Sequence, residues 1–419
     1  MNIVKTVTQT ITRFLTLCCC LHLILSSSLT TYANFNWPDI DTDIQALAGI
    51  VIDADSGAVL YEKNADTPYP PASTVKILTA LVVLEEYKSM DDIITFTTET
   101  ADPIEPDAGN RLNTIEGDRL TVRDCLYSML LISSNQSANA LVTYIAGDID
   151  SFVEIMNEKA TELGLVKSHF DNPSGLSSDN QMVTARELAV IARAAYNNPE
   201  LLKISKAITY ELTPTQSYPN GHTIQNEHRL LYTTDPNDDY YYPSAVAGKT
   251  GYLQTAGNTL VTYAEQNGKR LISIVLKGHH RQYFADSKAM LEFGFSHFDN
   301  YTIPETELTA FTDTELEYLQ REGHDKTNLT VSGNMSLTLP KDIPPDHALR
   351  KISQLSGGMH PKGAVAVLEY RYQQKVIGTI YIVDTAELLP DNLLPIHETL
   401  RQAQDLPVIW LLTLLLLPL

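Results

Sequence analysis

The fold is decided by Pro70-Pro71-Ala72-Ser73-Thr74-Val75-Lys76, which leads directly into the largely apolar Ile77-Leu78-Thr79-Ala80-Leu81-Val82-Val83-Leu84. Two prolines can lead into a helix but not continue one, so this pattern predicts a helix from near Ser73 to about Tyr87. Ser73 and Lys76 would then share one helical face, with Cβ atoms about 5–6 Å apart. The lysine amine could take the serine hydroxyl proton there, and the positive end of the helix would favour a developing oxyanion.

A Ser-x-x-Lys pair is weak evidence by itself, because serine is a common helix N-cap and the pair arises by chance in many helices. Two later motifs change this interpretation. Ser133-Ser134-Asn135 follows the apolar residues 126–132, and Lys249-Thr250-Gly251 follows Val246-Ala247-Gly248. The motifs Ser-x-x-Lys, Ser-x-Asn and Lys-Thr-Gly, in this order, are the signature of penicillin-binding proteins and serine β-lactamases.

Within that group the chain resembles the low-molecular-mass penicillin-binding proteins, the serine D-alanyl-D-alanine carboxypeptidases. Residues 152–164, 170–176, 184–189 and 256–260 look like connecting segments of that family, and the resemblance spans roughly residues 40–298. It implies an α+β fold of the penicillin-binding-protein and β-lactamase type. In that fold a mixed sheet is flanked by helices and a helical lobe, and family members carry a small β-rich domain after it.

The resemblance also implies roles for individual residues. The catalytic residues would be a nucleophile, its base and their two partners in the second motif, namely Ser73, Lys76, Ser133 and Asn135. We expect hydrogen bonds to Ser133 and Asn135 to orient the Lys76 amine. Substrate binding would fall to Lys249, Thr250, Gly251, Tyr252 and Arg281. The backbone N–H groups of Ser73 and Tyr252 match the family's oxyanion donors. Tyr252 stands where many carboxypeptidases have histidine, which leaves the leaving-group preference open.

The first 33 residues read as an export signal. Lys5 and Arg13 precede an apolar run, and small residues end at Ala33. A membrane-spanning anchor is the weaker alternative, because the apolar run is short for a bilayer span. The signal would carry Cys18, Cys19 and Cys20 away and leave Cys125 as the one cysteine, which we expect to be a buried, inert thiol rather than a second nucleophile.

Composition excludes some partners. Removal of residues 1–33 would leave 51 acidic against 28 basic residues, a formal net charge of about −23. A body this acidic does not bind nucleic acid or anionic lipid heads by bulk charge. The pairs His279-His280 and His222 with His228 lack helical spacing and nearby ligands, so we expect surface histidines, no metal site and no cofactor.

Strand patterns place the domains. Residues 47–53 with 58–62, and 259–263 with 270–276 across Asn267-Gly268, predict hairpins, while residues 120–195 read mostly helical. Strands at both ends with helices between them suggest one mixed sheet and an inserted helical lobe over residues 34–298. Alternation at 335–339, 364–370 and 376–382 predicts a β-rich domain over residues 299–388.

Residues 389–419 combine apolar residues at helical spacing with a nearly continuous apolar end from Pro407 to Leu419. We expect a monotopic or shallow membrane anchor, and a buried core helix is the alternative. The protein would then lie at the outer face of the cytoplasmic membrane.

Three functions compete on the sequence alone. The first is a D,D-carboxypeptidase that removes the terminal D-Ala from peptidoglycan stem peptides through a Ser73 acyl-enzyme and is acylated by β-lactams. The second is a β-lactamase or D,D-endopeptidase, although the chain has no Glu-x-x-x-Asn deacylating segment at the expected place after Ser133. The third is a non-catalytic sensor of peptidoglycan or β-lactams, which three intact motifs disfavour.

Overall fold

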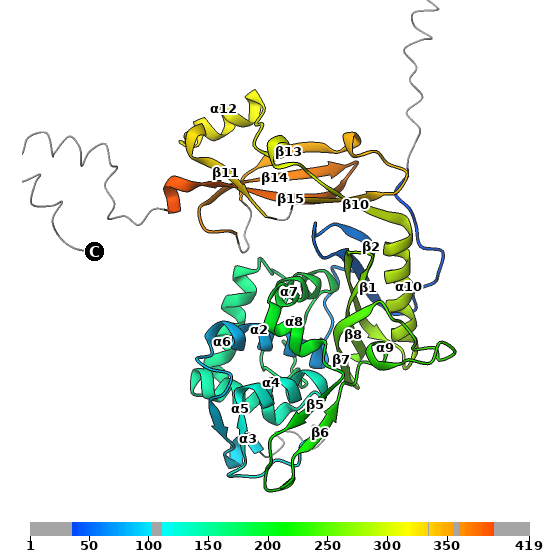
Figure 1. Cartoon of the computed structure of the whole chain (residues 1–419), viewed down its shortest axis with the longest axis vertical. Coiled ribbons are helices and arrows are strands. Elements are labelled where there is room, and N and C mark those ends of the chain that lie inside the picture. Colours follow the sequence, from blue (N-terminus) through cyan, green and yellow to red (C-terminus); the bar gives the residue numbers. More distant parts are fainter. Residues whose placement is uncertain (1–35, 102–110, 334, 356–359, 389–419) are drawn as a thin grey trace, which may run out of the picture. The chain divides into compact units, whose positions relative to one another are not determined.

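The computed structural model describes residues 36–101, 111–333, 335–355 and 360–388 (Figure 1). It divides into two units, Met1–Pro38 and Asp39–Leu419, and every element named below belongs to the second unit. The predicted export signal and the predicted membrane anchor lie outside the described residues. Among the helices that are described, none is long and apolar enough to cross a membrane.

A five-stranded sheet forms the centre of the second unit, in the order β2-β1-β9-β8-β7. Its strands are β1 (Ala48–Asp53), β2 (Val59–Lys63), β7 (Ala245–Leu253), β8 (Gly257–Gln266) and β9 (Lys269–Gly278). All four pairings are antiparallel, so the prediction of a mixed sheet is wrong in that respect. Short turns cause three of these pairings, because strands joined by a hairpin must run antiparallel, whereas β1 and β9 are joined by no turn and lie far apart in the chain. The predicted turn Asn267-Gly268 has positive φ at both residues, as a tight hairpin requires.

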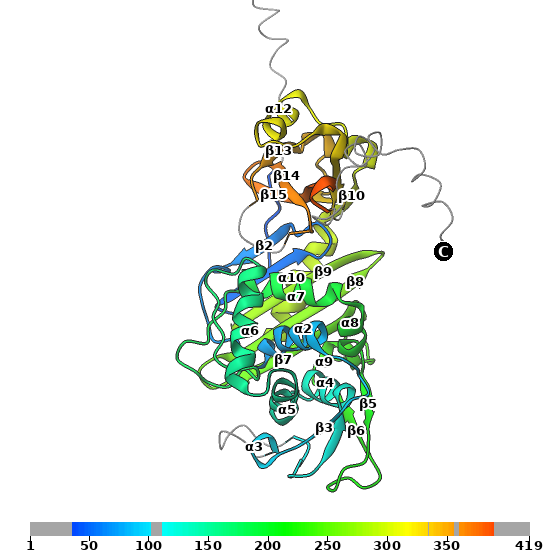
Figure 2. The same ribbon diagram turned by 90° about the vertical axis from the view of Figure 1, so that its left-hand side faces the viewer.

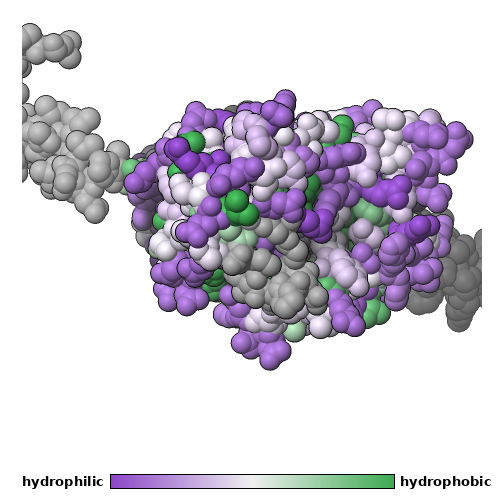
Figure 3. All heavy atoms as spheres, turned by 90° about the horizontal axis from the view of Figure 1, so that it is seen from below, coloured by the Kyte–Doolittle hydropathy of each residue, from purple (hydrophilic) through white to green (hydrophobic). Residues whose placement is uncertain are grey.

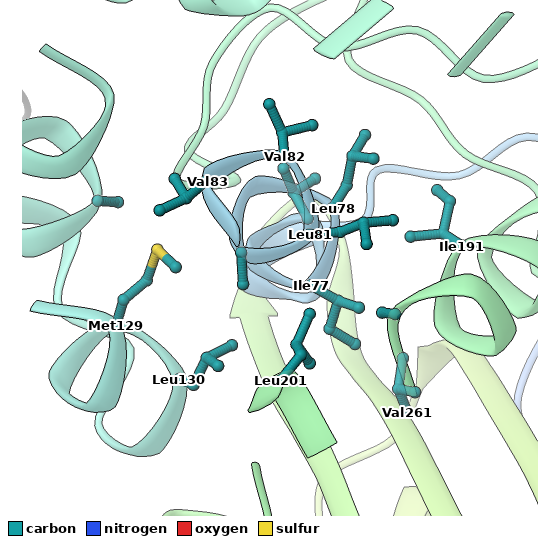
Figure 4. Close-up of a cluster of buried hydrophobic side chains, with 14 of the residues drawn as sticks. Ile77, Leu78, Leu81, Val82, Val83, Met129, Leu130, Ile191, Leu201 and Val261 are labelled. Carbon is teal, nitrogen blue, oxygen red and sulfur yellow. The ribbon is translucent and has the colours of Figure 1, made fainter. Parts of the chain in front are cut away.

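Helices cover both faces of this sheet (Figures 1 and 2). Helix α10 (Gln282–His297) packs on one face, and α7 (Ala185–Asn197) and α8 (Pro199–Ser205) pack on the other. Helix α2 (Lys76–Glu86) lies within the helical layer, and its first nine residues, 76–84, are all buried. Figure 4 shows apolar side chains from α4, α7, α8 and β8 surrounding it. The helix that follows the Ser-x-x-Lys motif is therefore a core element with no solvent-facing side over most of its length.

The predicted helical lobe is present between β2 and β7. Its helices are α3 (Thr98–Ala101), α4 (Val122–Leu131), α5 (Asn135–Ala146), α6 (Ile149–Glu162) and α9 (Arg229–Tyr232). Two hairpins accompany them, β3 (Ile93–Thr95) with β4 (Arg119–Thr121) and β5 (Thr209–Leu212) with β6 (His222–Gln225). Side-chain caps from Thr121, Ser134 and Asp148 start α4, α5 and α6. Cys125 is buried in α4, and burial raises the pKa of its thiol, as expected for an inert cysteine.

The region after α10 is β-rich, as predicted. A four-stranded antiparallel sheet has the order β11 (Leu329–Ser332), β15 (Lys375–Asp384), β14 (Ala364–Tyr372) and β13 (Leu349–Ser353), and β10 (Phe298–Thr302) pairs with β12 (Ser336–Pro340). Two helices, α11 (Glu305–Leu308) and α12 (Asp313–Arg321), and three 3-10 turns, η2 (Lys326–Asn328), η3 (Pro345–His347) and η4 (Thr385–Leu388), complete it. The boundary at residues 298 and 299 stays a prediction.

Candidate active site

Ser73 lies in a 3-10 turn, η1 (Ala72–Val75), which runs into α2 at Lys76. The predicted helix is thus present, but its first turn is tighter than the α-helix expected, and Ala72 has φ +50°. Pro70 and Pro71 have no N–H groups, and the Thr74 hydroxyl donates to the Pro71 carbonyl at 2.7 Å. The Ser73 side chain caps neither η1 nor α2, so the helix-cap interpretation of this serine is wrong.

Lys76 is completely buried, and its amine contacts three oxygen atoms. It lies 3.1 Å from Ser73 Oγ and 2.7 Å from Asn135 Oδ1, and it donates to the Ser174 carbonyl. Burial, and next the charge of Lys249, hold the pKa of this amine well below its usual range. A neutral amine has two N–H groups and one lone pair. Because Asn135 Oδ1 and the carbonyl can only accept, the lone pair is left for the proton of Ser73.

Ser133 and Asn135 reach the site from the junction of α4 and α5. Asn135 begins α5 and holds Lys76, as we expected. The expected bond from Ser133 to Lys76 is absent, because Ser73, Asn135 and the Ser174 carbonyl already occupy the amine. Ser133 has φ +62°, and its buried hydroxyl has no hydrogen-bond partner among the described residues. An unpaired buried hydroxyl costs about 1–3 kcal/mol, which suits a group that pairs only when substrate is bound.

Strand β7 places the third motif beside Ser73. Lys249 is buried, and its amine donates to the Thr250 carbonyl at 3.0 Å. Burial lowers the pKa of Lys249 to about 8, opposed by the nearby carboxylate of Glu227, so this lysine stays mostly protonated at pH 7. A Cβ atom at Gly251 would fall 2.3 Å from Thr259 Oγ1 and 2.9 Å from the Ser73 nitrogen. Only glycine allows the strand to pass this close to the serine backbone.

The last two predicted site residues differ in their positions. The Tyr252 side chain is 66% exposed and lines the pocket described below. Arg281 is an exposed residue before α10 with φ +66°, and it is not among the residues that line this pocket. The neighbouring Tyr283 lines it instead. Arg281 therefore remains a predicted substrate contact that the geometry does not place in the pocket.

These motifs surround one pocket of about 500 Å³. Ser73, Ser133, Asn135, Thr250 and Gly251 line it, which brings together residues from all three motifs. Sequence reasoning missed two groups of lining residues. The first is the loop carrying Gly175 and Leu176, and the second is a set of charged residues, Arg111, Glu227 and Arg229.

The missed charges alter the electrostatics of the pocket. Arg111 forms an ion pair with Glu227, whose other carboxylate oxygen lies 3.5 Å from the Thr250 hydroxyl. Buried Lys249 adds a second cation near Glu227, while Arg229, which also lines the pocket, pairs with Asp238. The sequence signal that could have revealed these charges is the adjacent Glu227, His228 and Arg229. Their separation from Lys249 in the chain gave no reason to place them in the same pocket.

The prediction for His228 is also wrong. We expected a surface histidine, whereas its side chain is buried behind β7 and Nε2 lies 3.0 Å from Thr262 Oγ1. Burial lowers its pKa to about 3. The described residues contain no group of three His, Cys, Asp or Glu side chains that could hold a metal ion. His228 therefore supports the strand as a neutral ring.

Fold and pocket together define the class as an α+β serine peptidase in which a buried lysine adjoins the candidate nucleophile. The chain belongs to the D-alanyl-D-alanine carboxypeptidase family, whose sequence profile matches residues 35–280. It is 32% identical to the D-alanyl-D-alanine carboxypeptidase DacB2 of Mycobacterium tuberculosis, over 62% of this chain and 89% of that relative.

Two solved structures extend the comparison. Penicillin-binding protein 6B from Escherichia coli is 25% identical, with a TM-score of 0.60, and the match covers 84% of this chain and 98% of that one. A mutant of the Streptomyces K15 DD-transpeptidase is 30% identical, with a TM-score of 0.56, and covers 61% of this chain and 100% of its own. The longer match includes the β-rich region as well as the site.

Proposed function

We propose that this protein is a serine D,D-carboxypeptidase that removes the terminal D-Ala from peptidoglycan stem peptides through an acyl-enzyme on Ser73. One observation carries the proposal. The buried amine of Lys76 lies 3.1 Å from Ser73 Oγ and contacts two carbonyl oxygens, so in the neutral amine both N–H groups can go to those oxygens and the lone pair is left for the Ser73 proton. That is the geometry of a nucleophile with its own base.

Acylation follows from this arrangement. Ser73 Oγ attacks the carbonyl carbon of the penultimate D-Ala while Lys76 takes the hydroxyl proton. The backbone N–H groups of Ser73 and Tyr252 stabilise the oxyanion. The C–N bond then breaks, the leaving D-Ala nitrogen receives the proton that Lys76 took from Ser73, and water later hydrolyses the ester. A β-lactam carbonyl would follow the same first step, and the opened ring would remain attached.

Selection of a free carboxylate follows from the charges at β7. Lys249 and Arg111 outnumber Glu227, and Arg229 is paired with Asp238, so this end of the pocket favours an anion. A charge-assisted hydrogen bond to a terminal carboxylate contributes about 1.5–3 kcal/mol, and an internal peptide bond lacks it. We therefore propose carboxypeptidase rather than endopeptidase activity.

The test is mass spectrometry after penicillin exposure, combined with D-Ala release from a pentapeptide. We expect one penicilloyl adduct on the peptide containing Ser73, and loss of both adduct and D-Ala release in Ser73→Ala. A sensor would form the adduct without releasing D-Ala. An adduct that persists in Ser73→Ala would overturn the assignment of the nucleophile.

Location completes the proposal. The family relationship supports action on peptidoglycan, and hence export, in agreement with the predicted signal at residues 1–33. We propose that residues 389–419 tether the protein to the outer face of the cytoplasmic membrane, as their apolar sequence suggests.

A further inference from the structure

One carboxylate of the active-site pocket has no part in the proposed reaction. Glu227 lines the pocket at the end where the terminal carboxylate of the substrate would bind, although a second negative charge there opposes that binding. We propose that in the free protein the Glu227 side chain occupies the place of the substrate's terminal carboxylate, and that it turns away when substrate binds. The inference rests on the proposed function and specifies how the pocket selects its substrate.

The partners of the Glu227 carboxylate are groups that also suit a substrate carboxylate. Oε1 forms an ion pair with Arg111 Nη1 at 2.5 Å, and Oε2 lies 3.5 Å from the Thr250 hydroxyl, which can donate to it. Lys249 lies close enough for the charge of Glu227 to oppose the lowering of its pKa. One hydroxyl and two cations are the donors that a terminal carboxylate needs. The two carboxylates therefore compete for the same donors.

The backbone of Glu227 is fixed, whereas its side chain can turn. The Glu227 N–H donates to the Leu131 carbonyl at 3.0 Å, and the adjacent residues Asn226 and His228 are 3% and 1% exposed. The Glu227 side chain is 30% exposed, and that of its partner Arg111 is 53% exposed. An ion pair this exposed contributes little to stability, so little is lost when it opens. Rotation of the Glu227 side chain would move its carboxylate into solvent without disturbing the fold.

Displacement of Glu227 affects substrates according to their charge. A peptide with a free C-terminal carboxylate takes over Arg111 and the Thr250 hydroxyl, but it must first separate them from Glu227. A peptide with a C-terminal amide brings no charge for these donors and leaves the Glu227 pair closed. Removal of the Glu227 charge should therefore accelerate the cleavage of substrates that end in a carboxylate. The leaving D-Ala also carries a carboxylate, so the return of Glu227 to its donors would help to release it.

The test is Glu227→Gln, which keeps the size of the side chain and removes its charge. The substrates are a peptide ending in D-Ala-D-Ala with a free C-terminus and the same peptide with a C-terminal amide. We expect kcat/KM for the free peptide to rise by about tenfold, mainly through a lower KM, since one charge-assisted hydrogen bond contributes about that factor. The amide should gain about twofold or less, and free D-Ala should inhibit the variant more strongly than the wild type.

The pH of the assay separates this competition from an effect on Lys249. Glu227 opposes the lowering of the Lys249 pKa, so Glu227→Gln should lower that pKa further below about 8. The other charges beside Lys249, on Arg111 and Lys76, are unchanged by the variant. At about pH 6 Lys249 keeps its charge in both proteins, and the tenfold gain is expected there. As pH rises toward 8 the variant loses the Lys249 charge first, so its gain over wild type should shrink.

The control is Glu211→Gln, which removes one negative charge from an exposed position on β5, outside the pocket. Strand β5 lies at the end of the helical lobe, whose mostly hydrophilic surface is seen in Figure 3. This variant should match the wild type with both peptides. An unchanged or lower kcat/KM for the free peptide in Glu227→Gln, or an equal rise for the amide, overturns the inference. If wild type forms the Ser73 penicilloyl adduct and releases D-Ala while Glu227→Gln shows no gain, the role of Glu227 alone is wrong.

Discussion

The sharpest test of the site is Gly175→Ala, because the structure shows what a methyl group would meet there. Gly175 has φ +86°, and its added Cβ atom would lie 2.0 Å from the Ala72 carbonyl oxygen and 2.8 Å from the Ser73 nitrogen. These are backbone atoms that no side-chain rotation can clear. The loop must therefore move away from Ser73, and the Ser174 carbonyl must move with it and release Lys76.

Gly147→Ala is the matched control. Gly147 ends α5 with φ +91°, and nothing lies within 4 Å of an added Cβ atom. Alanine at positive φ destabilises both variants by about 1–2 kcal/mol, but only the change at Gly175 adds a steric clash with backbone atoms. We expect Gly147→Ala to lose about that much stability and to keep its acylation rate.

Gly175→Ala should unfold at lower urea concentration than Gly147→Ala, and its acylation by penicillin should slow by at least about tenfold, since one displaced oxyanion donor costs about that or more. Stopped-flow or mass-spectrometric acylation rates, with urea unfolding of the same samples, measure both effects. Equal acylation rates in the two variants would refute the inference that this loop positions Ser73 and Lys76.

Four further predictions concern the two lysines and the membrane tether. Lys76→Arg should retain the fold and lose acylation by orders of magnitude, because a guanidinium cannot accept a proton; near-normal acylation would exclude Lys76 as the base. A stem peptide with a free C-terminal carboxylate should be cleaved at least about tenfold faster than the same peptide with a C-terminal amide. Lys249→Ala should reduce this ratio of cleavage rates. The pKa of Lys249 is lowered to about 8, so its positive charge is present below that pH and lost above it. We therefore expect kcat/KM for the peptide with a free carboxylate to fall as pH rises through about 8, and kcat/KM for the amidated peptide to show no such fall. Removal of residues 389–419 should release an active protein from membranes, and membrane retention equal to that of the full chain would point to an uncleaved N-terminal signal.

Local patterns were sufficient for most of the elements. Runs of strand-type residues predicted β1, β14 and β15, and Asn267-Gly268 predicted the β8–β9 turn, because strand and turn preferences depend on neighbouring residues. The hydrophobic period of a strand and the capping residues of a helix do not determine whether two distant strands pair parallel or antiparallel. That is why a mixed sheet was expected where β1 lies antiparallel to β9, more than 200 residues away in the chain.

The sequence by itself was sufficient to predict the site residues, since Ser73 with Lys76, Ser133 with Asn135 and the Lys-Thr-Gly motif are recognisable from order and spacing alone. Only the tertiary structure decided what surrounds them. Burial and Lys249 lower the pKa of Lys76, and the Ser174 carbonyl holds its amine where Ser133 was expected. Arg111 reaches the pocket by pairing with Glu227. These features depend on distances between segments far apart in the chain and on the exclusion of water, and chain folding alone sets both.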